Sequence, residues 1–438
     1  MKPMMERPGR SFLMDAEPEP TAPAARPPRL RALGAHARPR SLPFDQHPTF
    51  RELHAARQLG MQTGLRDPHY RTHEARAGAH TRLDGRELIN FASYDYLGLN
   101  GHPEVLTAHA DAAALYGTSV SGSRLTSGER PVHAALEAAL ADLYEAEAGL
   151  LFVSGHATPG SVLHALLGPR DLILHDELIH NCVVVGAEGV RCQRKSYRHN
   201  DMEDLERYMV RHRDQFENVL IITEGLFSMD GDGCDLRALI DIKERHGAWL
   251  MVDEAHALGV MGATGKGSAE HAGVDPRRID IWFGTLSKAL VGCGGYICGS
   301  RALTDILRAR APGLVYSVGM PAPVAAAALS ALGIMRREPQ RVQALQARSR
   351  DLWEGMRALG LDLGTSWGVG IVPVILGGDL ATLAASQRLE ALGINTFPVL
   401  QPGVPANSAR LRFFVSAAHA SADIERALEV LRVAAPLS

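Results

Sequence analysis

The chain has 438 residues, enough for roughly two or three domains with a large buried core. A hydrophobic fraction of 46% and a charged fraction of 22% are typical of a globular protein and exclude a largely disordered one. The formal net charge of -3 gives no general attraction to nucleic acid or to an anionic membrane. The 5 cysteines are too few and too scattered for a disulfide scaffold or a zinc finger, so we expect a cytoplasmic protein.

The first part of the chain divides into two segments. Residues 1–45 are rich in proline and arginine and contain no apolar run of the kind that a secretory signal needs, so they are predicted to form a flexible tail. An organelle-targeting or partner-docking role for this tail is the alternative. Residues 46–95 are interpreted as an N-terminal arm, helical from Arg51, with a hairpin turn at Asp84-Gly85 before the apolar run 88–92.

Residues 96–325 alternate short apolar runs with helical patterns, which predicts an α/β domain around a mostly parallel sheet. The predicted strands cover residues 149–154, 171–175, 218–227, 248–252 and 279–284. The helical patterns between them cover residues 162–167, 202–212 and 236–246.

The uncharged run 314–335 is the one segment long enough to suggest a membrane span. Its many alanines, with prolines and glycines, make it weakly apolar, so we predict a buried helix over 324–335 and no membrane span. Residues 326–438 are predicted to form a smaller α+β domain. Its expected elements are helix 341–359, strand 371–376, helix 380–392, strand 410–415 and a last helix from Ala422.

Ligands of an open parallel sheet bind beyond the carboxyl ends of its strands, so the residues that come after each predicted strand are the candidate site. These residues are Gly155 and His156 after the first strand, Glu224 and Ser228 after the third, Asp253 and His256 after the fourth, and Thr285 and Lys288 after the fifth.

Together these groups are what pyridoxal 5'-phosphate requires. Thr158-Pro159 is a good helix start, and the N–H groups before it can bind a phosphate with help from the Thr285 hydroxyl. Lys288 supplies an amine for a Schiff base, and Asp253 a carboxylate that keeps a pyridine nitrogen protonated. Taken alone, Asp253 is more often a loop carboxylate and Lys288 a solvated lysine. The ordered set therefore carries the hypothesis, and no metal site is expected.

The sequence also resembles a known family, the α-oxoamine synthases, which are fold-type I pyridoxal-phosphate enzymes. The resemblance covers about residues 80–435, in order. Its strings are SYDYLGLNGHPEV (93–105), GSRLTSGERPVHAALE (122–137), TEGLFSMDGD (223–232), VDEAHALGVMGATGKG (252–267), GTLSKALVGCGGYICG (284–299) and LRFFVSAAH (411–419).

The resemblance implies a role for each matched residue. Lys288 would be the Schiff-base lysine and general base. Asp253 would pair with the pyridinium nitrogen, His256 would bond the phenolate oxygen, and His180 would stack on the ring. Gly155 and His156, helped by Thr285, would hold the phosphate, although an aromatic residue is common at position 156. Glu224 and Ser228 would lie behind the cofactor.

Further implications concern substrate and assembly. Arg412 would bind the amino-acid carboxylate, and Tyr94 is a second candidate substrate contact. The segment 316–319 would reach across a homodimer with shared active sites, although Val318 stands where a hydroxyl residue is often found.

The implied reaction joins a small amino acid, expected to be glycine, alanine or serine, to an acyl thioester of coenzyme A or an acyl-carrier protein. Carbon dioxide is lost, and an α-amino ketone forms. The alternatives are an aminotransferase or retro-aldol lyase of the same fold, and a non-catalytic scaffold subunit. Lys288 disfavours the scaffold, because such a subunit would be expected to lack it. A ligand-sensing regulator would need a helix-turn-helix domain that the proline-rich tail cannot form.

Overall fold

The computed structural model describes residues 41–434. The chain divides into two compact units, residues 1–59 and 60–438, and all of the candidate site residues belong to the second. The first contains a short 3-10 helix, Phe44–Gln46, and the start of helix α1, Pro48–Thr63, where a helix was predicted from Arg51. Of the tail predicted over residues 1–45, residues 1–40 lie outside the described residues, so its flexibility stays a prediction.

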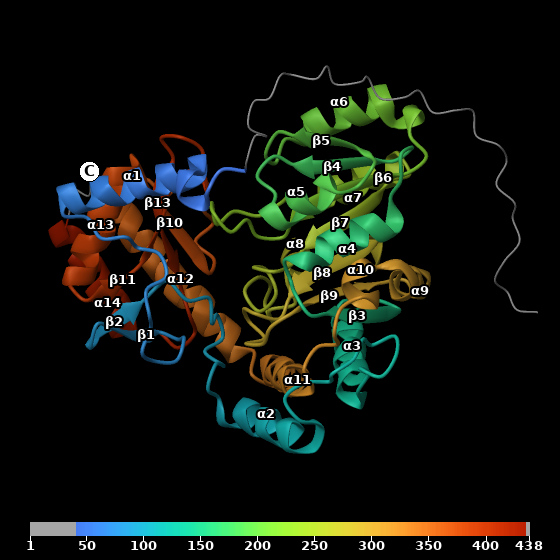
Figure 1. Cartoon of the computed structure of the whole chain (residues 1–438), viewed down its shortest axis with the longest axis horizontal. Helices are drawn as coiled ribbons and strands as arrows, with labels where there is room; N and C mark the ends of the chain where they lie inside the picture. Colours follow the sequence, from blue (N-terminus) through green and yellow to red (C-terminus); the bar gives the residue numbers. More distant parts are fainter. Residues whose placement is uncertain (1–40, 435–438) are drawn as a thin grey trace, which may run out of the picture. The chain divides into compact units, whose positions relative to one another are not determined.

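The centre of the second unit is a sheet of seven strands in the order β3-β9-β8-β7-β6-β4-β5 (Figure 1). The strands are β3 Ala148–Phe152, β4 Leu172–Asp176, β5 Gln193–Tyr197, β6 Val219–Glu224, β7 Trp249–Asp253, β8 Ile281–Thr285 and β9 Gly295–Gly299. Strand β9 pairs antiparallel with both of its neighbours, β3 and β8, and the other pairs of this sheet are parallel. The predicted mostly parallel α/β sheet is thus confirmed.

Helices cover both faces of this sheet, because its strands are apolar on both sides. Successive residues of β6 show this: Ile221 packs in one hydrophobic core, while Leu220 and Ile222 pack in the other. The helices of this large domain are α2 Pro103–Tyr116, α3 Pro131–Leu143, α4 Ala157–Leu166, α5 Asn181–Glu188, α6 Met202–His212, α7 Leu236–Arg245, α8 Ser268–Ala272, α9 Arg301–Arg310, α10 Pro312–Val315 and α11 Ala322–Arg337.

Helix α11 covers the uncharged run for which a buried helix was predicted. Its residues Leu332 and Met335 belong to the same core as Ile221, so the helix, which spans the expected boundary at residue 326, packs with the large domain. Among residues 41–434, no helix combines the length and the apolar character needed to cross a membrane.

A smaller domain is built from both ends of the unit. One antiparallel sheet, in the order β10-β13-β12, contains β10 Ile371–Gly377, β12 Phe397–Val399 and β13 Ala409–Phe414. The other, in the order β1-β2-β11, joins the hairpin β1 His80–Leu83 and β2 Arg86–Asn90 to β11 Ile394–Asn395. Its helices are α12 Gln340–Ala358, α13 Asp379–Ala391 and α14 Ser421–Ala434.

The predicted hairpin turn is present at Asp84 and Gly85, whose φ angles are 50° and 74°. Positive φ at both central residues is the geometry that Asp-Gly favours in a two-residue turn. Beyond the hairpin, Phe91 and Tyr96 are fully buried in the core of the small domain. Phe91, near the end of the predicted N-terminal arm, therefore packs with the C-terminal elements.

Candidate active site

Three of the predicted site residues end neighbouring strands of the large sheet. Glu224 is the last residue of β6, Asp253 of β7 and Thr285 of β8. Because parallel neighbours end at the same edge, the fold brings these side chains together. Lys288 comes three residues after Thr285, in the turn between β8 and β9.

Lys288 lies among groups of both signs of charge. Burial lowers the pKa of its amine, while the carboxylates of Asp253 and Glu224 oppose that shift. Its Nζ atom lies 5.8 Å from the centre of the Tyr94 ring. A lysine whose pKa is lowered by burial can act as a nucleophile or a general base near neutral pH.

Burial raises the pKa of both acids of the site. Asp253 is 3% exposed, and burial raises its pKa to about 6, against the opposing effect of Lys288 and of a 2.8 Å hydrogen bond from the Ala255 N–H. Burial and the neighbouring charge of Asp253 raise the pKa of Glu224 well above its usual range. The two carboxyl groups therefore do not both ionise without a cost in free energy.

Three histidines surround this group. His256 is buried, its Nδ1 lies 2.7 Å from the Tyr96 hydroxyl, and its ring stacks on Phe414 at 5.9 Å with an interplanar angle of 3°. Burial, together with the charges of Lys288 and Arg412, lowers its pKa well below the ordinary value, so the ring is neutral.

His180 begins helix α5, where its Nδ1 accepts a hydrogen bond of 3.2 Å from the Cys182 N–H. Burial and the charge of Lys288 lower its pKa to about 4. The ring of His156 meets that of His180 edge to face at 6.3 Å. His180 thus lies near Lys288, and His156 lies beside His180.

A narrow cradle lies between the end of β3 and the end of β8. A Cβ atom at Gly155 would lie 2.7 Å from the Thr285 hydroxyl oxygen, a contact too short for any residue but glycine. The Thr285 hydroxyl contacts the Ser287 hydroxyl at 2.8 Å and donates to the Gly294 carbonyl at 2.9 Å. The cradle thus combines hydroxyl groups with backbone at the start of α4.

The predicted helix start at Thr158-Pro159 is wrong in detail. Helix α4 begins at Ala157, and His156 occupies the N-cap position without a side-chain cap. Thr158 is fully buried, and its hydroxyl donates to the Ser154 carbonyl at 2.7 Å instead of capping the helix. The two residues that precede the helix, Gly155 and His156, are nevertheless those predicted.

Arg412 projects from β13 of the small domain toward the loop after β6. Its Nη1 donates to the Ser228 carbonyl at 3.0 Å and contacts the Met229 sulfur at 3.2 Å. Its guanidinium carbon lies 4.5 Å from the centre of the Phe414 ring. Burial lowers the pKa of Arg412, and among the described residues its Nε is buried without a partner. A buried donor of this kind suits a carboxylate ligand.

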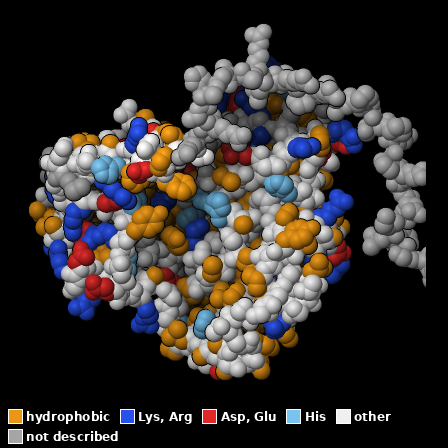
Figure 2. All heavy atoms as spheres, in the orientation of Figure 1, with side chains coloured by type: hydrophobic (Ala, Val, Ile, Leu, Met, Phe, Trp, Pro, Cys, Tyr) orange, Lys and Arg blue, Asp and Glu red, His pale blue; other side chains and the backbone are white. Residues whose placement is uncertain are grey.

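Tyr94 completes the group on its open side. Its ring is 40% exposed and meets Phe414 edge to face at 5.4 Å. On the face drawn in Figure 2, histidine and basic side chains gather in a hollow near the centre.

Sequence reasoning missed a second charged cluster behind this site. His199 bridges two buried carboxylates, with Nδ1 2.9 Å from Asp176 and Nε2 3.0 Å from Asp232. Burial opposes its charge, but the hydrogen bonds and charges of the two aspartates raise the pKa of His199 to about 10. Asp232 ends the string TEGLFSMDGD, whereas His199 lies in a polar turn without any signal of its own.

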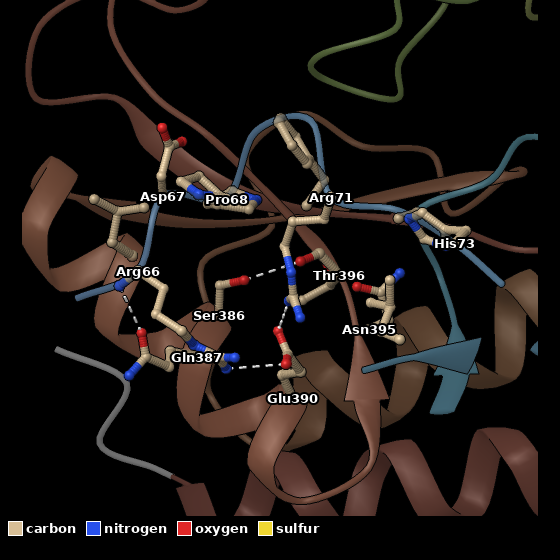
Figure 3. Close-up of a pocket in the computed structure, with 15 residues that line it drawn as sticks. Arg66, Asp67, Pro68, Arg71, His73, Ser386, Gln387, Glu390, Asn395 and Thr396 are labelled. Atoms are coloured by element: carbon tan, nitrogen blue, oxygen red, sulfur yellow. Dashed lines mark hydrogen bonds and ion pairs between the residues drawn. The ribbon is translucent and has the colours of Figure 1, made fainter. Parts of the chain in front are cut away.

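A separate small cavity, of about 60 Å³, lies between residues 66–73 and helix α13 (Figure 3). Its charged groups pair with one another: Arg66 donates to Glu390 at 3.0 Å, and Arg71 pairs with Glu390 and, at 2.7 Å, with Asp84. This cluster fastens the segment to the small domain and leaves little room for a ligand.

Comparisons with known proteins match this geometry. The sequence model of aminotransferase class I and II matches residues 86–431. The 8-amino-7-oxononanoate synthase of Methylocella silvestris is 40% identical over 353 residues, covering 81% of this chain and 98% of that protein. That of Anaeromyxobacter sp. strain K is 41% identical over 359 residues, covering 82% and 89%.

Solved structures agree. The serine palmitoyltransferase of Sphingomonas wittichii superposes with a TM-score of 0.85 at 29% identity, covering 89% of this chain and 98% of that one. A structure of SPT that holds pyridoxal phosphate has the same TM-score at 27% identity. The chain therefore belongs to the α-oxoamine synthases, pyridoxal-phosphate-dependent acyltransferases that condense an amino acid with an acyl thioester and release carbon dioxide.

Proposed function

We propose that the site around Lys288 binds pyridoxal phosphate and that its residues catalyse the family's condensation. The observation that carries the proposal is the burial of Asp253 beside Lys288 at the end of the parallel sheet, with each influencing the pKa of the other. A cationic pyridine nitrogen would favour the ionised form of Asp253, whose carboxylate otherwise has a costly buried charge.

The residues present fit the cofactor at its other end as well. The glycine at position 155 lets the Thr285 side chain approach its backbone closely, and the Ser287 hydroxyl, 2.8 Å from that of Thr285, offers a donor to a phosphate. We assign this cradle to the phosphate group and the amine of Lys288 to the covalent link.

When bound, the cofactor supplies an electron sink for the carbanion formed at the amino-acid Cα. Lys288, whose pKa is lowered by burial, removes the proton from Cα. Asp253 holds a proton at the ring nitrogen through its negative charge. Tyr96 occupies Nδ1 of His256, so we assign Nε2 of His256 to the phenolate oxygen. His180 is assigned to the face of the ring.

Glu224 and Ser228 support these groups from behind. Burial and the charge of Asp253 raise the pKa of Glu224, and the Ser228 carbonyl accepts a hydrogen bond from Arg412. Arg412 binds the carboxylate of the amino acid, and Tyr94 closes over the substrate from the open side. The acyl donor is a thioester of coenzyme A or of an acyl-carrier protein.

We further propose that the active form is a cytoplasmic homodimer in which residues 316–319 contact the partner's site. Tyr316 is 87% exposed and Val318 is 49% exposed, so both side chains are accessible for such a contact. Light scattering tests this assembly, because an active monomer at assay concentration would contradict it.

The reaction is tested in two steps. The enzyme is given candidate amino acids in deuterated water without thioester, and exchange of the Cα proton is followed by NMR. Acyl thioesters are then added with carboxyl-labelled amino acid. We expect labelled carbon dioxide and free thiol in equal amounts. Transfer of nitrogen to a keto acid without thiol release would identify an aminotransferase, and the proposal would be wrong.

A further inference from the structure

The loop after β6, residues 226–233, contacts Arg412 of the small domain through Ser228 and His199 of the large domain through Asp232. Its base is closed by a bridge between Leu226 and Gly233 and by a 2.8 Å hydrogen bond from the Phe227 N–H to the Asp232 carbonyl. Its tip carries Ser228 and Met229, whose atoms contact Arg412. The position of the tip therefore determines where the guanidinium lies.

The same tip is held to β13 at a second point. Arg410 donates from Nη1 to the Met229 carbonyl at 3.0 Å and to the Asp230 carboxylate at 2.6 Å. Two arginines of one strand thus share the tip of one loop. A shift of that loop would therefore move the side chain of Arg412.

His199 fixes the base of the loop. Its Nε2 contacts Asp232 at 3.0 Å, its Nδ1 contacts Asp176 at the end of β4 at 2.9 Å, and its ring meets Phe227 edge to face at 4.6 Å. The Thr365 hydroxyl, from the segment before β10, also donates to Asp232 at 2.7 Å. A protonated imidazole presents one donor at each end of a rigid ring, so it can span two carboxylates.

We propose that His199 is a positioning residue for the amino-acid substrate. By linking Asp232 to Asp176, it fixes the loop 226–233 on the edge of the sheet and so aligns Arg412 for the substrate carboxylate. This inference rests on the proposed function, because it requires Arg412 to bind that carboxylate.

The test compares His199→Gln with His246→Gln in the holoenzyme. His246 is the matched control, because its Nε2 contacts Glu206 at 3.1 Å in a similar partly buried pair. Amino-acid affinity is measured from the change in cofactor absorbance on titration, and kcat and KM are measured in parallel. We expect His199→Gln to weaken amino-acid binding on the order of tenfold with a smaller change in kcat, and His246→Gln to change neither.

A cycle with Arg412→Ala identifies the route of the effect. If His199 acts through Arg412, the double variant binds the amino acid no more weakly than Arg412→Ala alone. A primary amine without a carboxylate should bind His199→Gln and the unaltered enzyme equally. Additive losses in the cycle, or an equal loss for that amine, would overturn the inference.

Two further measurements separate the possible failures. If His199→Gln fails to fold, Thr365→Val removes one hydrogen bond to Asp232 at an exposed position, and it should weaken amino-acid binding in the same direction. If it leaves that binding unchanged, the inference is wrong. If Arg412→Ala itself leaves amino-acid affinity unchanged, the proposed function fails first. If Arg412→Ala weakens binding and His199→Gln does not, the role of His199 is refuted and the proposed function stands.

Discussion

Glu224 and Asp253 are register partners at the ends of adjacent parallel strands, so two buried carboxyl groups stand side by side on the same edge of the sheet. Such a pair does not ionise fully, because two like charges in a buried site repel one another. Lys288 and the Ala255 N–H favour the charged form of Asp253, whereas the charge of Asp253 raises the pKa of Glu224. The two acids therefore have different tasks.

Asp253→Asn and Glu224→Gln should accordingly differ in effect. Asp253→Asn removes the negative charge that we pair with the pyridine nitrogen, and kcat should fall on the order of 10²–10³-fold. Glutamine resembles a protonated glutamate, so the second should change kcat by no more than about threefold. Steady-state kinetics of both variants decide this, and a larger loss in Glu224→Gln than in Asp253→Asn would mean that Glu224 is the ionised partner.

Lys288→Ala should bind the cofactor without a covalent link. Borohydride should trap no adduct, and turnover should fall by roughly 10²–10⁴-fold or more, because the base is lost. Lys266→Ala, at an exposed position, is the control and should retain both properties. An adduct mapped by peptide analysis to Lys243 or Lys266 in the unaltered protein would refute the assignment.

Gly155→Ala should weaken cofactor binding more than amino-acid binding. The added Cβ would lie 2.7 Å from the Thr285 oxygen and 3.3 Å from the Gly294 carbonyl, so the cradle must open. Overpacking of this kind costs about 1–3 kcal/mol, or roughly tenfold or more in the cofactor Kd. Gly78→Ala is the control, because a Cβ there meets no atom within 4 Å. Equal cofactor affinity in both variants would argue against a phosphate at this point.

The stability of the protein should fall in mild acid, in part through His419. This ring is buried, stacks on Phe91 at 4.5 Å, and accepts a 2.9 Å hydrogen bond from the Ser416 N–H. Burial lowers its pKa to about 4, against about 6.5 in an unfolded chain. Between these values the unfolded chain binds more protons, so the free energy of unfolding decreases as the pH falls.

From about pH 7.5 to about pH 5, this group should lower the free energy of unfolding by about 2 kcal/mol. Denaturant unfolding of His419→Gln and of the unaltered protein at both pH values measures the difference. The variant should lose less stability on acidification. Identical losses in the two proteins would show that the pKa of His419 is the same in the folded and unfolded states.

The sequence was informative where residues carry strong local signals. Glycine, aspartate and lysine directly after apolar runs predicted the edge of the sheet at which Asp253 and Lys288 meet. Strand β9 was missed because it begins and ends with glycine, a residue that is depleted in strands. Strand β5, with the sequence QRKSY, lies at the edge of the sheet and is largely exposed, so it has no apolar pattern to recognise.

The contacts around Arg412 could not be predicted in the same way. They join Ser228 to a strand that lies 184 residues later, and no local pattern encodes such a distance. The pairing of His199 with Asp176 and Asp232 likewise depends on how the end of β4 and two loops converge. Tertiary structure decides these partners, whereas sequence motifs show only that the residue types are available.

The parallel pairing of β2 with β11 also constrains how the chain acquires its structure. Ile89 faces Ile394, so the hairpin made early in synthesis finds its neighbouring strand only when most of the protein has been translated. The seven strands of the large sheet, all within residues 148–299, are complete much sooner. During translation the large sheet can therefore assemble first, while the edge of β2 that later receives β11 stays unpaired, a state that favours aggregation unless the edge is protected.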